Sequence, residues 1–98
     1  MVETIRSVLG GVEDPELGLD IVSLGLVYEI ECDEGRARVV YSLTSMGCPV
    51  GPMIEGEIRR VVEALDGVES VETELTFDPP WSPEKMSDDA RFLLGVYT

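Results

Sequence analysis

The sequence contains no histidine, and only one of its 98 residues, Lys85, is a lysine. Without histidine, Ser-His-Asp triads, Cys-His dyads and HExxH zinc sites are all excluded. The two cysteines, Cys32 and Cys48, are too few for a Cys₄ metal site within one chain. The reactive chemistry that remains rests mainly on carboxylates, hydroxyls and two thiols.

Long apolar runs are also missing. No run approaches the roughly 20 residues needed to span a bilayer, and the N-terminus, MVETIRSVLGG, lacks the charged and apolar regions of a signal peptide. We therefore expect a cytoplasmic protein with reduced thiols and no membrane contact. The length, with 44% hydrophobic and 28% charged residues, predicts one folded domain over residues 1–98.

Positive charge is scarce, because 20 Asp and Glu against 7 Lys and Arg give a net charge of −13. Such a surface repels phosphate groups, which excludes charge-driven binding to nucleic acid or to an anionic membrane. Two interpretations of the acidity stay open. It can serve solubility, including adaptation to high salt, or it can form an acidic docking surface.

Hydrophobic periodicity predicts the element order α-β-β-α-β-α. Apolar residues recur at helical spacing in the first dozen residues and between residues 52 and 67, and Ser87 suits the cap of a last short helix. Alternating apolar residues predict three strands, over residues 26–32, 36–43 and 71–77. Residues 14–25 have no clear period and are predicted to form an ordered loop. The class is α+β, a three-stranded mixed sheet with helices packed on one face.

The first two strands are predicted to pair across a two-residue turn at Glu34-Gly35. This register opposes apolar residues on one face: Cys32 and Ala37, Ile30 and Val39, Tyr28 and Tyr41, Leu26 and Leu43. On the other face it sets Glu31 opposite Arg38. The third strand follows a crossover helix, so it should run parallel to the second strand. Whether it lies beside the second strand or beside the first stays open.

This topology brings three irregular segments to one end of the sheet. They are DPELGLDIVSLG at residues 14–25, TSMGCPVG at 44–51 and DPPW at 78–81. The longer helix also begins at this end, and its N-terminus carries a partial positive charge. Because the carboxyl ends of strands often carry sites in α/β arrangements, we expect the functional site here.

Cys48 is the most reactive candidate at this end. Unpaired amides and the helix dipole favour its thiolate, which attacks electrophiles or binds soft metals, whereas the surrounding carboxylates oppose it. Gly47 permits close backbone approach and Pro49 stiffens the chain after the cysteine. A buried structural thiol is the alternative for Cys48. Cys32 lies at the hairpin end, about 20 Å or more away, and is predicted to pack in the core.

Acidic and hydroxyl side chains surround Cys48 in this arrangement. Asp14, Glu16 and Asp20 could ligate a metal, orient a thiolate or carry protons. Alternatively, Asp14-Pro15 is ordinary turn chemistry and Asp20 caps local backbone amides. Thr44 ends the second strand within reach of the same loops, where it could serve the site or bond to the loop backbone.

The segment after the third strand supplies the remaining candidates. Asp78 and Pro79 are most simply a rigid exit from the strand. Trp81 covers the open end of the small core or presents a surface to a partner.

At three places the sequence resembles the SufT/PaaD-type iron–sulfur maturation domain, also called the MIP-eighteen family: DPELGLDIVSLGLVY, TSMGCP and LTFDPPWSPEKMSDDAR. It is also similar to the N-terminal segment of some Mrp/ApbC-type P-loop iron–sulfur carriers. The likeness covers residues 3–95, with the motifs in the same order. It implies a NifU C-terminal-like α+β fold and a role in assembling iron–sulfur clusters or delivering them to apoproteins.

The resemblance also implies roles for individual residues. It puts the reactive cysteine at Cys48, the acidic motif at Asp14, Pro15 and Glu16 with a second acid at Asp20, the threonine at Thr44, and the C-terminal motif at Asp78, Pro79 and Trp81. The implied cargo is iron or a labile iron–sulfur cluster. The implied partners are apo iron–sulfur proteins and a P-loop carrier ATPase or the SUF machinery.

The sequence departs from the family pattern in two places. Pro49-Val50-Gly51-Pro52 stands where relatives often carry a leucine and small or acidic residues. The cysteine-rich C-terminal extension of PaaD-like proteins has no counterpart before Thr98, which argues against a PaaD-type role with an aromatic-ring oxygenase.

We predict a non-catalytic maturation factor that holds its cargo through Cys48. One thiolate per subunit cannot supply the four protein ligands of a [2Fe–2S] cluster, so a homodimer or a partner-bound holo form is expected. The first alternative is a metal-free adaptor whose loops and Trp81 dock apoproteins or a carrier ATPase. The second is a thiol enzyme with Cys48 as nucleophile and Asp20 as base, for which 98 residues leave little pocket volume.

Overall fold

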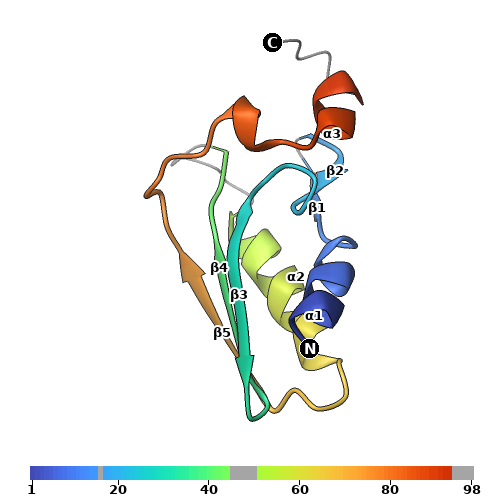
Figure 1. The fold of residues 1–98 in the computed structure, drawn as a ribbon, viewed down its shortest axis with the longest axis vertical. Coiled ribbons are helices and arrows are strands. Elements are labelled where there is room, and N and C mark those ends of the chain that lie inside the picture. The colour runs from blue at the N-terminus through green and yellow to red at the C-terminus, as the bar shows by residue number, and fades with distance from the viewer. Residues whose placement is uncertain (16, 45–50, 94–98) are drawn as a thin grey trace.

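The structure, a computed structural model, describes residues 1–15, 17–44 and 51–93. Two helices cover one face of a three-stranded sheet, and a short helical segment lies at one end of that sheet (Figure 1). The principal elements are α1 (Val2–Leu9), β3 (Val27–Asp33), β4 (Arg36–Tyr41), α2 (Gly51–Glu63), β5 (Ser70–Leu75), a 3₁₀ turn (Pro83–Lys85) and α3 (Asp88–Leu93). The predicted α+β class is confirmed. None of the helices in these ranges is long and apolar enough to cross a membrane.

The strand order is β3-β4-β5, so β5 lies beside β4 and not beside β3. β3 and β4 are antiparallel, and β4 and β5 are parallel, as the crossover through α2 predicts. The hairpin turn has positive φ at both central residues, 50° at Glu34 and 82° at Gly35. This is the backbone of the two-residue turn whose twist matches the flanking strands.

The predicted hairpin register is confirmed from the turn as far as Ile30 and Val39. Beyond this point it is wrong, because a β-bulge shifts the pairing between Val27 and Glu29 and sets Val27, not Tyr28, opposite Tyr41. A bulge places one extra residue in one strand and redirects the neighbouring side chains. The Tyr28 hydroxyl accordingly donates to the carbonyl of Pro79 at 2.9 Å, while Tyr41 stays in the core.

The core lies between the inner face of the sheet and the two helices. The helical contribution comes from Ile5, Leu9, Ile54, Ile58 and Val62, which are all 0–1% exposed. Met53 precedes Ile54 in α2 but is 54% exposed. One residue of an α-helix turns the side chain by about 100°, which carries Met53 from the buried face that Ile54 occupies to the surface.

Residues 14–25 contain more regular structure than the predicted loop. Two short strands, β1 (Glu13–Asp14) and β2 (Leu19–Asp20), pair antiparallel with each other. Ile21 and Leu24 follow them and are fully buried, which anchors the segment in the core. Strands of two residues are too short to produce a periodic pattern, so the sequence could not reveal them.

Candidate functional site

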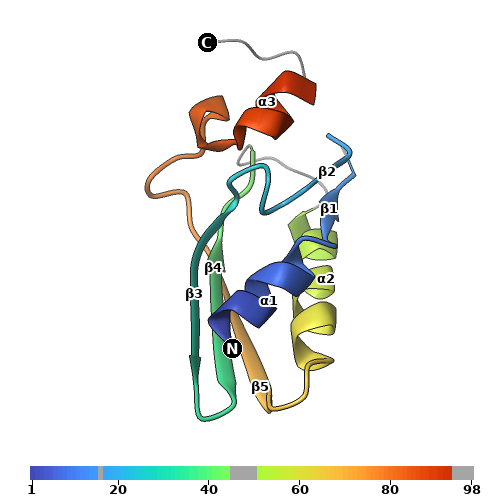
Figure 2. The ribbon, with the colours of Figure 1, turned by 45° about the vertical axis from the view of Figure 1, so that its right-hand side comes forward.

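Two of the three predicted loop segments meet at the end of the sheet where β4 ends (Figure 2). The indole N–H of Trp81 donates to the carbonyl of Leu24 at 2.6 Å. The backbone N–H of Ser87 donates to the carbonyl of Ser23 at 2.8 Å. These bonds join residues about 60 positions apart and confirm that segments 14–25 and 78–81 converge.

The third loop segment is described only at its two ends. Thr44 is half-buried two positions after the fully buried Ser42, and Gly51 begins α2. A Cβ atom at Gly51 would lie 3.0 Å from Leu43 Cδ1, so the helix start packs closely against the end of the strand. The predicted site residues Gly47, Cys48 and Pro49, like Glu16 in the first loop, lie outside the described residues.

Asp14 is a fully buried carboxylate in β1, with 0% of its surface exposed. Its backbone carbonyl accepts hydrogen bonds from the N–H groups of Leu17, at 3.2 Å, and Gly18, at 2.8 Å. The turn predicted after Asp14 is therefore present. Because burial of a carboxylate is costly, its complete burial at this position distinguishes Asp14 from the many surface acids of the chain.

Asp20 is half-buried and shapes the turn that follows β2. Its Oδ2 atom accepts a hydrogen bond from the Ser23 N–H at 2.9 Å, and its backbone carbonyl accepts one from the Leu24 N–H at 3.1 Å. The capping interpretation of Asp20 is confirmed. The cap also fixes the turn whose carbonyl at Leu24 receives the Trp81 indole, so Asp20 positions the junction between the two loops.

Asp78 and Pro79 are exposed and lead from β5 towards this junction. The backbone N–H of Asp78 donates to Thr76 Oγ1 at 3.2 Å, and the Asp78-Pro79 peptide bond is cis. Pro79 also supplies the carbonyl that Tyr28 binds. The segment is therefore tied both to β5 and to the start of β3.

A shallow cavity of about 430 Å³ opens beside the junction and is lined by Gly25, Val27, Tyr28, Pro79 and Lys85. The Lys85 ammonium lies 5.1 Å from the centre of the Tyr28 ring, within the range of a cation–π contact. Sequence reasoning missed both residues. Lys85 could have been singled out as the single lysine of the sequence. The bulge that turns Tyr28 out of the core leaves no trace in the pattern of apolar residues.

The Trp81–Leu24 hydrogen bond should carry measurable stability. We expect Trp81→Phe to lower the free energy of unfolding by about 1–2 kcal/mol, because the carbonyl of the buried Leu24 loses its donor while most of the ring packing stays. Urea denaturation followed by circular dichroism measures this loss. Tyr28→Phe is the matched control, since it removes an exposed hydrogen bond and should cost less than about 0.5 kcal/mol. Equal losses in the two variants would contradict the structural role of the indole.

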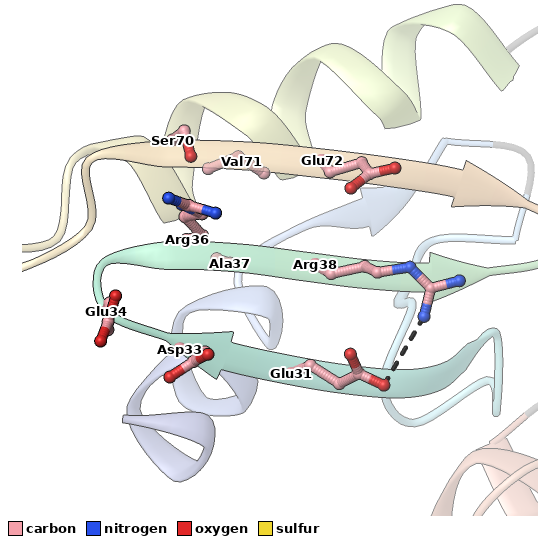
Figure 3. A pocket seen from close by; sticks show the side chains of 9 residues that line it. All are labelled: Glu31, Asp33, Glu34, Arg36, Ala37, Arg38, Ser70, Val71 and Glu72. Carbon is pink, nitrogen blue, oxygen red and sulfur yellow. Dashed lines mark ion pairs between the residues drawn. The ribbon is translucent and has the colours of Figure 1, made fainter.

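The face of the sheet opposite the helices carries an ionic network centred on Arg38. Its guanidinium lies 2.9 Å from Glu74, 3.6 Å from Glu31 and 3.8 Å from Glu29. Figure 3 shows Arg38 and Glu31 reaching towards each other across the paired strands. A hydrogen bond with Glu31 and the negative charge of Glu31 raise the pKa of Glu29, which the attraction of Arg38 only partly offsets.

The raised pKa of Glu29 has a defined consequence for the pH dependence of folding. The folded state holds this proton more tightly than the unfolded chain does, so the stability contribution of Glu29 is fully present below the unfolded pKa, near 4.5, and is lost as the pH rises through the folded pKa. We expect an NMR titration of Glu29 to have its midpoint above 4.5 and to move down in Glu31→Gln. An unchanged midpoint in that variant would contradict the assigned cause.

Within the described residues, no group of three or more His, Cys, Asp or Glu side chains is arranged to hold a metal ion. Asp14 and Asp20, although paired strands bring their segments together, do not form such a group with a third ligand there.

The sequence family described as iron-sulfur cluster assembly protein matches residues 2–73 of the chain. The Fe-S protein maturation auxiliary factor YitW of Bacillus subtilis (strain 168) is 44% identical over 95 residues, which cover 96% of this chain and 93% of that protein. The Fe-S protein maturation auxiliary factor SufT of Staphylococcus aureus (strain USA300) is 45% identical over 84 residues, or 85% of this chain and 96% of that one. A crystal structure titled as a domain of unknown function, DUF59, from Bacillus anthracis superposes with a TM-score of 0.93 at 37% identity, covering 98% of this chain and 92% of that chain.

Proposed function

The chain belongs to the iron-sulfur cluster assembly protein family, and from this membership we propose that it holds iron or a labile iron–sulfur cluster through Cys48 and passes it to apoproteins. The two relatives named as maturation auxiliary factors support the broader role in iron–sulfur protein maturation, because each match spans most of both chains. In this proposal the protein acts as a carrier and not as an enzyme.

The observation that carries this proposal is the convergence of the loops at the end of β4. The Trp81–Leu24 bond fixes two motif loops there, and Thr44 and Gly51 bring the ends of the third to the same place. Cys48 lies in sequence between those two residues, three positions before α2 begins. Cys32 pairs with Ala37 close to the hairpin turn, at the opposite end of the sheet, and packs partly buried against the core. Of the two cysteines, only Cys48 therefore belongs by sequence to one of these loops.

The ligand count explains why the cargo would be labile. Cys48 offers one thiolate, and a [2Fe–2S] cluster takes four protein ligands. The remaining ligands would come from a second copy, from the accepting apoprotein, from small thiols or from a carboxylate such as Asp20. Soft thiolate ligands suit iron–sulfur clusters, and a site shared between molecules releases its cargo when the partner leaves.

Anaerobic reconstitution with iron and sulfide tests the proposal. We expect the wild type and Cys32→Ser to acquire visible absorption, bound iron and bound sulfide, and Cys48→Ser to acquire none. Cys32→Ser is the matched control, since it removes the other thiol from the hairpin end. The loaded species should have the mass of a dimer, or should require glutathione as a monomer. Equal loading of Cys48→Ser and the wild type would contradict the proposal.

A metal-free adaptor is the second candidate, and the partly exposed Trp81 at the junction of two loops favours it. In that case the loop cluster and the half-buried Trp81 would dock apoproteins or a P-loop carrier ATPase. No variant would then load a cluster, and Cys48→Ser would support maturation of a client as well as the wild type. Pull-down of a client apoprotein with Trp81→Ala would measure this docking directly.

A further inference from the structure

The face of the sheet that points away from α1 and α2 has no other described helix or strand packed on it (Figures 1 and 2). Alternate residues of the strands build this face, together with the hairpin turn. Its charged members are Glu29, Glu31, Asp33, Glu34, Arg36, Arg38, Glu72 and Glu74. We call this set the open acidic face. Its carboxylates outnumber its arginines by three to one.

The arginines neutralise only part of this charge. Arg38 is shared among Glu29, Glu31 and Glu74. Within the described residues, Asp33, Glu34 and Glu72 take part in no ion pair. These three acids line a cavity of about 440 Å³ towards the hairpin end of the sheet, where Figure 3 shows them around Arg36 and Arg38.

We propose that the open acidic face docks a basic, Arg- and Lys-rich segment of a partner protein. Charge complementarity identifies this occupant, because cationic side chains would pair with the carboxylates that Arg38 leaves unneutralised. A second copy of the chain is a poor match for this face, since a chain with a net charge of −13 offers few cations to pair with these acids. Nucleic acid is repelled by the same negative charge.

This surface goes beyond the proposed carrier function because it lies away from the loop cluster. The seven residues of β3 extend roughly 20 Å between the Trp81 junction and the hairpin turn. A partner held near the hairpin therefore leaves the loops at the other end free. Docking and cargo transfer would use different parts of the molecule.

The expected binding is weak and sensitive to salt. Exposed ion pairs contribute little individually, and ions screen them beyond about 10 Å at ordinary ionic strength. Their larger effect is on the rate of encounter, which a concentrated negative field increases. Such a surface therefore favours docking that is brief and selective for cationic segments.

The test uses a fluorescein-labelled peptide of alternating arginine and glycine, followed by fluorescence anisotropy with the intact protein. Asp33→Asn combined with Glu72→Gln should weaken binding about fivefold, because two pairing partners are lost. Glu13→Gln combined with Glu63→Gln changes the net charge equally, at exposed positions outside this face, and should weaken binding less than about twofold. None of these four side chains takes part in an ion pair of the described structure, so we expect all variants to fold.

A second pair of variants tests the opposite sign. Arg36→Gln should strengthen peptide binding about twofold, because Arg36 lines the cavity and opposes a cation. Arg6→Gln, on α1, should leave binding unchanged.

Four results would overturn the inference. The first three are equal weakening by the two acidic pairs, equal binding of an alternating glutamate–glycine peptide, and no binding of the arginine peptide by the wild type at low salt. Sedimentation of Asp33→Asn/Glu72→Gln gives a fourth, because stronger self-association of that variant with unchanged peptide binding would assign the face to a second copy. Cluster loading is measured alongside, and since it should be unaffected by these variants, failure here is separable from failure of the carrier function.

Discussion

Gly25→Ala is expected to lower the free energy of unfolding by about 3 kcal/mol, because the added methyl group meets backbone that cannot easily move away. The Cβ atom would overlap the carbonyl oxygen and carbon of Lys85, well inside contact distance. Gly25 also has φ at +75°, which costs a residue with a side chain roughly 1–2 kcal/mol. The two costs add, and both act where the 3₁₀ turn packs against the first loop.

Gly18→Ala provides the matched control for this substitution. Gly18 has nearly the same φ, +73°, but a Cβ atom there meets nothing within 4 Å. Only the conformational cost of about 1–2 kcal/mol is expected. Urea denaturation of the two variants separates the terms. A Gly25→Ala variant no less stable than Gly18→Ala would show that the contact with the Lys85 backbone is not as close as the structure has it.

Ile58→Ala is expected to cost about 3–4 kcal/mol. Ile58 is 0% exposed on the face of α2 that packs against the sheet, so truncation loses the burial of its methyl groups and leaves a cavity. For a domain whose stability is typically about 5–15 kcal/mol, this is a large fraction of the total. Thermal and urea unfolding measure the loss.

Met53→Ala tests the same helix at a surface position. Met53 is 54% exposed, and its truncation should change the free energy of unfolding by less than about 0.5 kcal/mol. Alanine is also the better helix former, which offsets part of any lost contact. If the two variants were equally destabilised, the buried face of α2 would be assigned wrongly.

The parts of the fold that followed from sequence are those where two independent patterns agree. Apolar alternation and charge matching both fix Cys32 opposite Ala37 and Glu31 opposite Arg38, and the structure has both pairs. Connectivity made β5 parallel to β4. Tyr28 was misassigned to the core because a bulge depends on local backbone geometry, which alternation does not record.

The candidate site was predictable in its location but not in its contacts. The predicted strand directions alone placed residues 14–25 beside residues 78–81, and the Trp81–Leu24 hydrogen bond confirms this placement. The backbone of Lys85 lies against Gly25, although 60 positions separate the two residues in the sequence. Local sequence patterns do not record such a contact, so it was not predicted. For Asp20, spacing allowed both a ligand and a cap, and the hydrogen bond to Ser23 shows the cap. The assignment of Cys48 stays a prediction.

Transfer of a cluster to an apoprotein tests the role of Cys48 most directly. The wild type, Cys32→Ser and Cys48→Ser are each exposed to iron and sulfide, separated from the excess, and mixed with an apo-ferredoxin whose cluster is followed by visible circular dichroism. The wild type and Cys32→Ser should load the ferredoxin, and Cys48→Ser should load no more than a mixture without protein carrier. Full transfer by Cys48→Ser would contradict the carrier function assigned to that thiol.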